Sequence, residues 1–477
     1  MGTMAEQRYG IEKSALPRLA KLLERVLNDV KPNPEEIKAT TRSINEVVGK
    51  LKKVTPKNVE ILVAGSVARG TQIRGSSDVD IFLLFPRKMD EKEIEKKGLE
   101  IAKKIIDKKA GDTYSMNYAE HPYTKIKFSK LALDVEIVPA YKIRDIKERS
   151  TAVDRTQLHN DFVISNLTSK QRDDVRILKT FLNSRHIYGA EARIEGFSGY
   201  LCELLIYHYK SFERLLAAFA NLKLPLALDM TSLQPEFGKG SANVKKYSER
   251  FGKDFVVIDP VDENRNVAAS VSDESLARLV LACRELIKNP NDKSFFGHGY
   301  SDIGARAKLS KLSKDLGTDM FVLHFKTDEI AEDIIWQQVK RLRLKLNDTL
   351  THHGFCPTLS AQNMADNEAV IAFFVVKDLT IRSCITKGPS VIMGEAAERF
   401  MKSHSNSLFF ALSGDSIRST EKPKFTTAEQ LLRHALTPKG VDFPSYLDKR
   451  RTKLFVNSTS EGIAKMIYQA YSINVSL

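Results

Sequence analysis

The sequence predicts a multidomain α+β protein with a mixed head, a mainly helical central domain and a mixed C-terminal part. Three observations support this. The 477 residues exceed what one hydrophobic core usually holds. At the start of the chain, segments with apolar residues at helical spacing alternate with short runs rich in β-branched residues. In the middle of the chain, apolar residues occur mainly at helical spacing. We predict domain boundaries of 1–150, 151–290 and 291–477.

The head contains amphipathic segments, with apolar residues every three or four positions, and apolar runs bounded by turn residues. In chain order these predict helices at 14–30 and 35–54, strands at 59–65 and 79–85, a helix at 90–110, and paired strands within 123–143 that end at Pro139. A glycine- and serine-rich turn separates the first two strands.

The central domain has its clearest helical patterns at 173–185 and 199–222, and the segment 254–266 predicts a strand that leads into a polar loop. In the C-terminal part, the patterns predict strands at 320–325, 369–376 and 407–412 and a long helix around Trp336.

Composition limits the classes of function. Lysine and arginine total 74 against 60 acidic residues, a net charge of +14 that is typical of a protein with a polyanionic partner, of one that binds an anionic membrane surface, or of a solvated basic surface. Apolar runs such as "AVIAFFVV" are far shorter than the roughly 20 residues that span a bilayer. We therefore expect no membrane association.

The cysteines and the N-terminus predict a cytoplasmic protein. The chain lacks CxxC spacing, and we expect its cysteines to be reduced core residues: Cys202, Cys283, Cys356 and Cys384. The first residues lack the apolar core and cleavage site of a secretory signal.

Two aspartates at the start of the strand at 79–85 are the first candidates for chemistry. Asp78 and Asp80 are two residues apart, so both face the same side of a strand. Neighbouring carboxylates repel each other, and a divalent cation such as Mg²⁺ relieves that repulsion. Upstream, Gly65 and Ser66 can turn backbone N–H groups toward a phosphate chain, and Arg69 adds positive charge.

A later strand offers a third carboxylate. In "LALDVEIVPAY" both Asp134 and Glu136 lie on one face, so periodicity leaves the choice open. A strand, a Gly-Ser turn and an acidic pair resemble the signature of polymerase-β-like nucleotidyltransferases. That resemblance implies two metal ions, one activating an attacking hydroxyl and one stabilising the pyrophosphate leaving group.

A more selective resemblance extends through the central domain. The segments "YAEHPY", "AVDRT", "IYGAE", "GFSGYLCELLI" and "DPVDENRNVAAS" resemble the class I, archaeal-type CCA-adding enzymes, which are tRNA nucleotidyltransferases. The resemblance implies template-independent addition and repair of the 3′-terminal CCA of tRNA from CTP and ATP. It places two Mg²⁺ ions on Asp78, Asp80 and Glu136, and Asp134 stays an alternative third ligand.

The same resemblance assigns nucleotide-contacting residues: Ser66, Arg69, His159, Lys179, Tyr188 and Arg265. An ordinary structural role is the alternative in each case. His159 would then be a helix-terminal histidine, Lys179 a surface lysine, Tyr188 a packed aromatic and Arg265 a loop arginine.

The C-terminal part fits an RNA substrate. In "IIWQQVKRLRLKLNDTL" apolar residues recur at helical spacing (Ile335, Val339, Leu342 and Leu346), and cations occupy the other faces (Lys340, Arg341, Arg343 and Lys345). Such a helix can grip folded RNA through its phosphates, or it is a solvated cationic helix. The resemblance implies contact with the acceptor-stem and T-arm side of tRNA, and it suggests a homodimer.

Competing interpretations remain at this stage. A poly(A) polymerase or an oligoadenylate synthase resembles this family in the head and central domain. A catalytically inactive RNA-binding relative and a DNA-repair polymerase are further alternatives.

Overall fold

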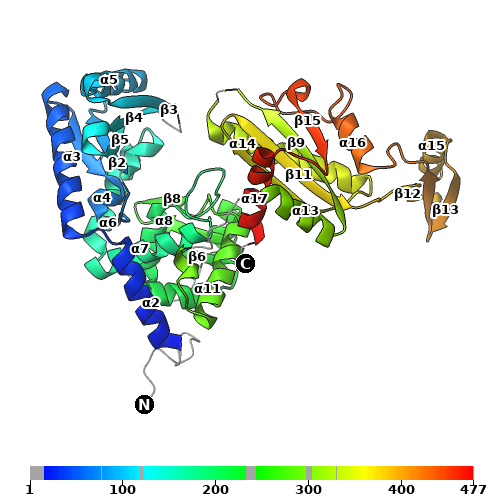
Figure 1. Ribbon diagram of the computed structural model, residues 1–477, viewed down its shortest axis with the longest axis horizontal. Helices are drawn as coiled ribbons and strands as arrows, with labels where there is room; N and C mark the ends of the chain where they lie inside the picture. The colour runs from blue at the N-terminus through cyan, green and yellow to red at the C-terminus, as the bar shows by residue number, and fades with distance from the viewer. Residues whose placement is uncertain are drawn as a thin grey trace, which may run out of the picture. The chain divides into compact units, whose positions relative to one another are not determined.

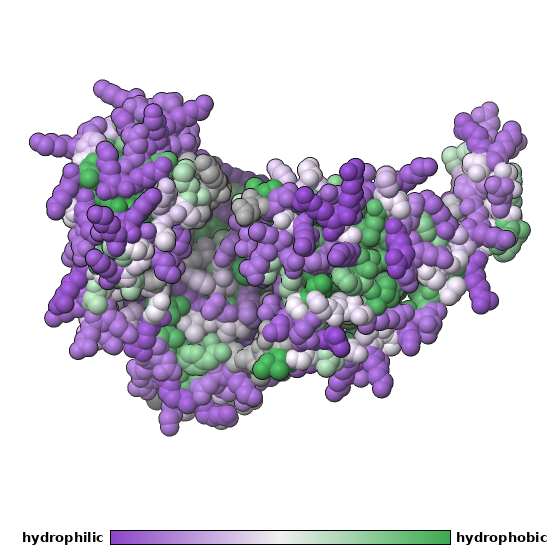
Figure 2. All heavy atoms as spheres, turned by 45° about the horizontal axis from the view of Figure 1, so that its top comes forward, coloured by the Kyte–Doolittle hydropathy of each residue, from purple (hydrophilic) through white to green (hydrophobic). Residues whose placement is uncertain are grey.

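The computed structural model describes residues 15–76, 78–118, 122–231, 243–296, 303–328 and 330–475. The chain forms two compact units, Met1–Gly299 and Tyr300–Ser476, and Figure 1 shows helices and sheets in both. The predicted α+β multidomain fold is confirmed. The surface seen in Figure 2 is mostly hydrophilic.

A five-stranded sheet forms the centre of the head. Its strand order is β1 (Glu60–Ala64), β2 (Asp78–Phe85), β5 (Leu133–Tyr141), β4 (Pro122–Phe128) and β3 (Thr113–Tyr118). Strands β2 and β5 are parallel, and the other neighbours are antiparallel.

Two helices cover one face of this sheet. The core beneath α3 (Pro34–Val54) and α5 (Glu91–Lys104) includes Val79, Ile81 and Leu83 of β2. Because side chains alternate along a strand, Asp78 and Asp80 lie on the opposite face, as the sequence predicts.

Three local details of the head differ from prediction. The turn after β1 begins with a short helix, α4 (Gly65–Arg69), and α5 ends at Lys104, followed by a single 3₁₀ turn at Lys108–Ala110. Strand β5 continues through Pro139 to Tyr141. Proline lacks the N–H that a central strand needs, but β4 pairs with β5 only up to Ile137, so Pro139 needs no donor on that side.

The helical region shares one core with the N-terminal helix. In chain order its helices are α2 (Ala15–Val30), α6 (Thr156–Asn166), α7 (Ser169–Ser184), α8 (Gly199–Tyr209), α9 (Phe212–Ala220), α10 (Val244–Phe251), α11 (Asp273–Lys288) and α12 (Lys293–Phe296). Leu19, Leu22 and Val26 of α2 pack in this core.

The predicted continuous helix at 199–222 is wrong. It breaks at Lys210, whose φ of 68° is left-handed, and the Ser211 side chain then caps α9 by accepting the Arg214 N–H. Serine is a strong N-cap residue, so the sequence could have predicted that a new helix begins after Ser211.

The predicted polar loop after Asp259 is also wrong. A small sheet contains β6 (Leu226–Asp229), β7 (Phe255–Asp259) and β8 (Asp262–Asn266), and the polar segment is β8 itself. Its end residues are buried with partners: Asp262 pairs with Arg149 and Arg155, and Asn266 accepts the backbone N–H of Val257. Ion pairs with residues far away in the chain therefore allow this polar segment to form a strand with buried ends.

The C-terminal unit is built on a four-stranded antiparallel sheet. Its order is β10 (Pro357–Ala365), β11 (Glu368–Val376), β9 (Thr318–Lys326) and β15 (Lys453–Val456). The packed helices are α13 (Ala305–Asp315), α14 (Glu332–His352) and α17 (Glu461–Val475), with α13 beside α17 in Figure 1. The four apolar residues predicted to face the core from α14 are buried.

A smaller sheet completes the unit, with β12 (Cys384–Ser390), β14 (Ser416–Glu421) and β13 (Phe409–Ser413) beside α15 (Glu395–Ser403); α16 (Ala428–Ala435) follows.

All four cysteines are free, as predicted. Cys202 and Cys283 are core residues, whereas Cys356 is exposed and Cys384 is partly exposed, so the core prediction fails for those two. Among the described residues, no helix is long and apolar enough to cross a bilayer.

Candidate active site

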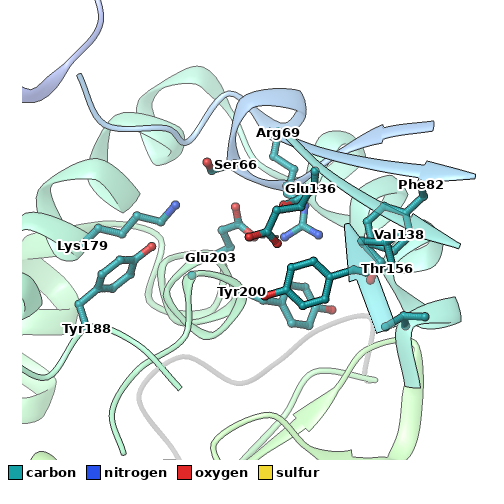
Figure 3. Close-up of a pocket in the computed structure, with 15 residues that line it drawn as sticks. Ser66, Arg69, Phe82, Glu136, Val138, Thr156, Lys179, Tyr188, Tyr200 and Glu203 are labelled. Carbon is teal, nitrogen blue, oxygen red and sulfur yellow. Dashed lines mark hydrogen bonds and ion pairs between the residues drawn. The ribbon is translucent and has the colours of Figure 1, made fainter. Parts of the chain in front are cut away.

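A pocket of about 640 Å³ opens between the carboxylate face of the head sheet and the helical region. Six of the predicted site residues line it: Ser66, Arg69, Asp80, Glu136, Lys179 and Tyr188. Figure 3 shows the side chains of Arg69 and Glu136 facing those of Lys179 and Tyr188 across this space. Residues separated by more than 100 positions in the chain therefore share one cavity.

Strand register places the acidic residues. The parallel pairing of β2 with β5 sets Asp80 opposite Glu136 and Asp78 opposite Asp134. Asp80 and Glu136 line the pocket, while Asp78 and Asp134 lie one step along the same face outside it. The register puts Glu136 beside Asp80 and Asp134 beside Asp78, and of the two later acids Glu136 is the one that lines the pocket.

Burial and mutual repulsion disfavour charge on these acids. Burial raises the pKa of Asp80, and the charge of Asp78 adds to that rise. Burial also raises the pKa of Glu136, with the charge of Asp80 as the next cause. A cation placed between them would favour both carboxylates.

Lys125 of β4 supplies one positive charge to this cluster. Its Nζ lies 3.4 Å from Asp78 Oδ1, 3.9 Å from Asp134 Oδ2 and 3.9 Å from Glu136 Oε1. Burial alone would lower the pKa of Lys125, but the three carboxylates, Asp78 foremost, raise it. The sequence did not single out Lys125, which faces Glu136 only through the β4–β5 pairing.

The acidic cluster suits a hard divalent cation in its chemistry. Three carboxylates within 4 Å of one ammonium form a concentrated set of oxygen donors, the type Mg²⁺ prefers. Within the described ranges, however, no three acidic, histidine or cysteine side chains are already arranged as a metal-binding group. The described acidic side chains lie near one another but do not form a complete set of metal ligands.

Gly65 allows the phosphate turn to approach the carboxylate. Its φ is +74°, and a Cβ built on it would lie 2.1 Å from Asp80 Oδ2. Only a residue without a side chain fits this position. The start of α4 and the Asp80 carboxylate are therefore in direct contact.

Buried polar contacts hold the cationic wall of the pocket. Arg69, 7% exposed, donates to Glu203 at 2.8 Å, and the Thr71 hydroxyl donates to the same carboxylate at 2.6 Å. Lys179 Nζ donates to the Thr71 carbonyl at 3.0 Å, and burial lowers the Lys179 pKa. Lys179 is buried, so the surface-lysine alternative is wrong.

Asp259, which is fully buried, joins the remaining predicted residues. Its carboxylate accepts from the Tyr200 hydroxyl at 3.1 Å and from Arg265 at 3.0 Å, and lies 2.8 Å from His159 Nε2. The His159 ring stacks on Tyr200 with centroids 4.0 Å apart. His159 and Arg265 do not line the pocket, but Tyr200 does. His159 contacts Tyr200 directly, and Arg265 is connected to it through the Asp259 carboxylate that both donate to.

The pKa values of this group follow from burial and pairing. Burial opposes charge on Asp259, but its contacts with His159, the Val261 N–H and Arg265 together outweigh that effect and lower the pKa. Burial lowers the pKa of His159. Sequence analysis missed Asp259, Tyr200 and Glu203; an acid at the end of an apolar strand, in "VVIDP", was the available signal for the first.

Tyr188 lines the pocket beside Lys179, and burial raises its pKa. In the predicted motif "YAEHPY", residues 119–121 lie outside the described residues.

Family models match three consecutive parts of the chain. A nucleotidyltransferase domain model matches residues 42–159, a model of the second domain of tRNA nucleotidyltransferase matches 173–296, and a model of the C-terminal domain of CCA-adding enzymes matches 316–448.

Curated relatives match over most of their length. The CCA-adding enzyme of Methanocaldococcus jannaschii is 33% identical over 392 residues, covering 81% of this chain and 84% of the relative. That of Archaeoglobus fulgidus is 34% identical over 356 residues, with coverages of 75% and 76%. Among solved structures, one of the Cid1 poly(U) polymerase is 16% identical with a TM-score of 0.45, over 60% of this chain and 99% of that one. The sequence relatives confirm the resemblance, and the chain belongs to the family of class I CCA-adding enzymes.

Proposed function

We propose that this protein builds and repairs the 3′-terminal CCA of tRNA without a nucleic-acid template, using CTP and ATP and releasing pyrophosphate. The observation that carries the proposal is the meeting of paired carboxylates, Asp80 and Glu136, with buried cations, Arg69 and Lys179, in one pocket. Its curated relatives are named CCA-adding enzymes.

Asp78, Asp80 and Glu136 are the residues that would hold the metal, with Asp134 the alternative to Glu136. Two bound Mg²⁺ ions would supply a lowered pKa at the attacking hydroxyl and stabilisation of the leaving pyrophosphate. Both pocket acids must be ionised to bind a cation, although burial raises their pKa values. Lys125 favours the ionised form of both acids while no cation is bound, and it competes with the cation for them.

The transfer itself exchanges one bond to phosphorus for another. The 3′-hydroxyl of the tRNA attacks the α-phosphorus of the nucleotide, and the bond to the pyrophosphate oxygen breaks in line. Ser66, Arg69 and Lys179 bind the triphosphate oxygens, Ser66 through a hydroxyl and the other two through charge. Glu203 and Thr71 hold Arg69 and Lys179 in place before the substrate binds.

We assign selection of the incoming base to the residues around Asp259. Arg265 gives one N–H to Asp259 and keeps others for a base edge, and a guanidinium can donate to the acceptor edge of cytosine or to adenine through different atoms. His159 and Tyr188 contribute a polar ring and a stacking face. The buried Asp259 carboxylate fixes the angle from which Arg265 approaches.

We assign a division of labour to the chain, with catalysis in 1–150, nucleotide binding in 151–290 and tRNA binding, on the acceptor-stem and T-arm side, in 291–477. The cations of α14 support the last assignment only in part. Arg343 donates to Gln362 and to Ser360, and Lys345 donates to the Asp442 carbonyl. The helix therefore offers fewer free N–H donors than its sequence predicts.

A homodimer completes the proposal. Large apolar side chains are exposed in the small C-terminal sheet and the segment beside it, at Ile385 (63%), Ile392 (86%), Phe409 (57%) and Leu412 (66%), where Figure 2 shows apolar surface. Surface of this kind is typical of an interface. Light scattering on a sizing column tests it, and a monomer at micromolar concentration would contradict it.

The test of the main proposal uses tRNA that lacks its terminal trinucleotide. The protein is incubated with this tRNA, CTP, ATP and Mg²⁺, and the product ends are sequenced. We expect CCA and then arrest. A run of A would indicate a poly(A) polymerase or oligoadenylate synthase, absence of pyrophosphate release an inactive RNA-binding relative, and preference for DNA primers a repair polymerase.

A further inference from the structure

A second cavity, of about 750 Å³, lies in the C-terminal unit and is lined by none of the residues assigned above. Helix α13, the start of β9, the end of β11 and the segment after β15 form its walls. Three cations line it, Arg306, Lys314 and Lys377, together with hydroxyl groups such as those of Ser310 and Thr459.

The cations of this pocket are unneutralised. In the part of the chain that the structure describes, Arg306, Lys314 and Lys377 form no ion pair. The acid in the pocket lining, Asp319, accepts the Asn457 side-chain amide at 2.8 Å. Three positive charges face one negative charge, so the pocket has a net positive charge of two and attracts anions.

The fold presents these groups from a rigid frame. Arg306, Ser310 and Lys314 recur every four residues on one face of α13, while Ala305 and Leu309 pack into the core. The Lys377 N–H donates to the Gly317 carbonyl at 2.9 Å, which ties the end of β11 to the turn before β9. Asn457 is paired with Met320 through its backbone N–H and its side chain.

One buried hydroxyl in the wall lacks a partner. Thr459 is 5% exposed, and its Oγ1 makes no hydrogen bond to any residue that the structure describes. A buried polar group without a partner is costly. A shift of the Thr459 side chain toward the cavity would let an anionic oxygen, directly or through a water, satisfy it.

We propose that this pocket binds phosphate groups of an RNA backbone, and this inference rests on the proposed function. None of the described residues that line it is aromatic, so these residues offer a base no ring to stack on, whereas their cations and hydroxyls match phosphodiester oxygens. The pocket is thus a backbone-binding site that positions tRNA and reads no sequence. It adds a second cluster of positive charge to the cations of α14.

The test compares two triple variants of the full chain. One is Arg306→Ala, Lys314→Ala, Lys377→Ala. The other removes the same charge elsewhere in the unit, at exposed lysines: Lys326→Ala, Lys402→Ala, Lys439→Ala. Because all six side chains are exposed, both variants should keep the wild-type Tm, which is measured first.

Filter binding of tRNA at several salt concentrations gives the readout. Each lost phosphate contact reduces the slope of log affinity against log salt by roughly 0.9, so the pocket variant should lose about 2 to 3 units of slope. Its KM for tRNA should rise with kcat and the KM for CTP unchanged. The control variant should stay within about half a unit of wild type.

Equal slopes for the two variants overturn the proposal. Competition with tripolyphosphate separates RNA from a small anion: if the pocket variant binds tRNA normally but loses tripolyphosphate binding, the ligand is a free polyphosphate and the RNA assignment is wrong. Binding is scored independently of CCA addition. An inactive wild-type protein would therefore refute the proposed function and still let this test decide.

Discussion

Replacing Gly65 with alanine tests the contact between the phosphate turn and the Asp80 carboxylate. The new Cβ would lie 2.1 Å from Asp80 Oδ2, whereas ordinary contacts begin near 3.4 Å. The carboxylate must therefore retreat by about 1.3 Å, or the turn must move by as much. A misplacement of about 1 Å in a catalytic group costs roughly 100-fold in rate.

The chain provides a matched control in Gly75. Its φ is +79°, close to the +74° of Gly65, but a Cβ there meets nothing within 4 Å. Both substitutions carry the backbone cost of a left-handed residue, about 1 to 2 kcal/mol. Only Gly65→Ala also displaces Asp80, so the difference between the variants isolates the site.

The assay is the single-turnover rate of CMP addition to tRNA lacking its CCA end, together with urea unfolding of each variant. We expect Gly75→Ala to lose about 1 kcal/mol of stability and keep its rate. Gly65→Ala should lose about 100-fold in rate beyond that. Rates within about threefold of each other would refute the assigned closeness of the turn and the carboxylate.

Three further substitutions probe neighbouring features. Burial raises the pKa of Asp174 to about 7, so the folded protein loses stability as the pH rises from 4 to 7 and this carboxylate ionises. The free energy of unfolding of Asp174→Asn, measured in urea, should therefore exceed that of wild type by up to about 4 kcal/mol at pH 8 and by almost nothing at pH 4. Lys125→Met removes an ammonium that competes for the metal-binding acids, so half-maximal activity should need about three- to tenfold less Mg²⁺; an unchanged or higher requirement would contradict this. Asp259→Asn removes the negative charge that pairs with Arg265 and replaces one of its two acceptor oxygens with an amide donor, so kcat/KM for CTP and ATP should fall about 10- to 100-fold and UTP should be rejected less well, whereas Asp262→Asn in the same hairpin should keep selectivity.

Local patterns predicted the parts of the site that are local in the chain. Strand alternation placed Asp78 and Asp80 on one face, and the Gly-Ser turn placed Ser66 and Arg69 near them. The β2–β5 register could not be predicted, because it joins strands far apart in the chain, and the alternation pattern does not fix the register of the neighbouring strands β4 and β5 either. It was the β2–β5 register that set Glu136 beside Asp80, and the β4–β5 register that brought in Lys125.

The sequence also did not predict which polar residues are buried beside the site as hydrogen-bond partners. Asp259 and Glu203 matter through what they touch, which is a tertiary property: the former meets Arg265 and the latter Arg69. Strand β8 was missed for the same reason, since Asp262 is buried by ion pairs with arginines far away in the sequence. Helix periodicity, by contrast, depends on one segment only, and α14 matched its prediction.

The most direct test of the account replaces the acid at the centre of the pocket. Asp80→Ala is assayed for CMP incorporation into tRNA lacking CCA and, in the same preparation, for tRNA affinity. If Asp80 and Glu136 carry the metal chemistry, incorporation falls by at least about 10³-fold while the Kd for tRNA stays within about twofold. Incorporation within about tenfold of wild type would contradict the assignment of the active site.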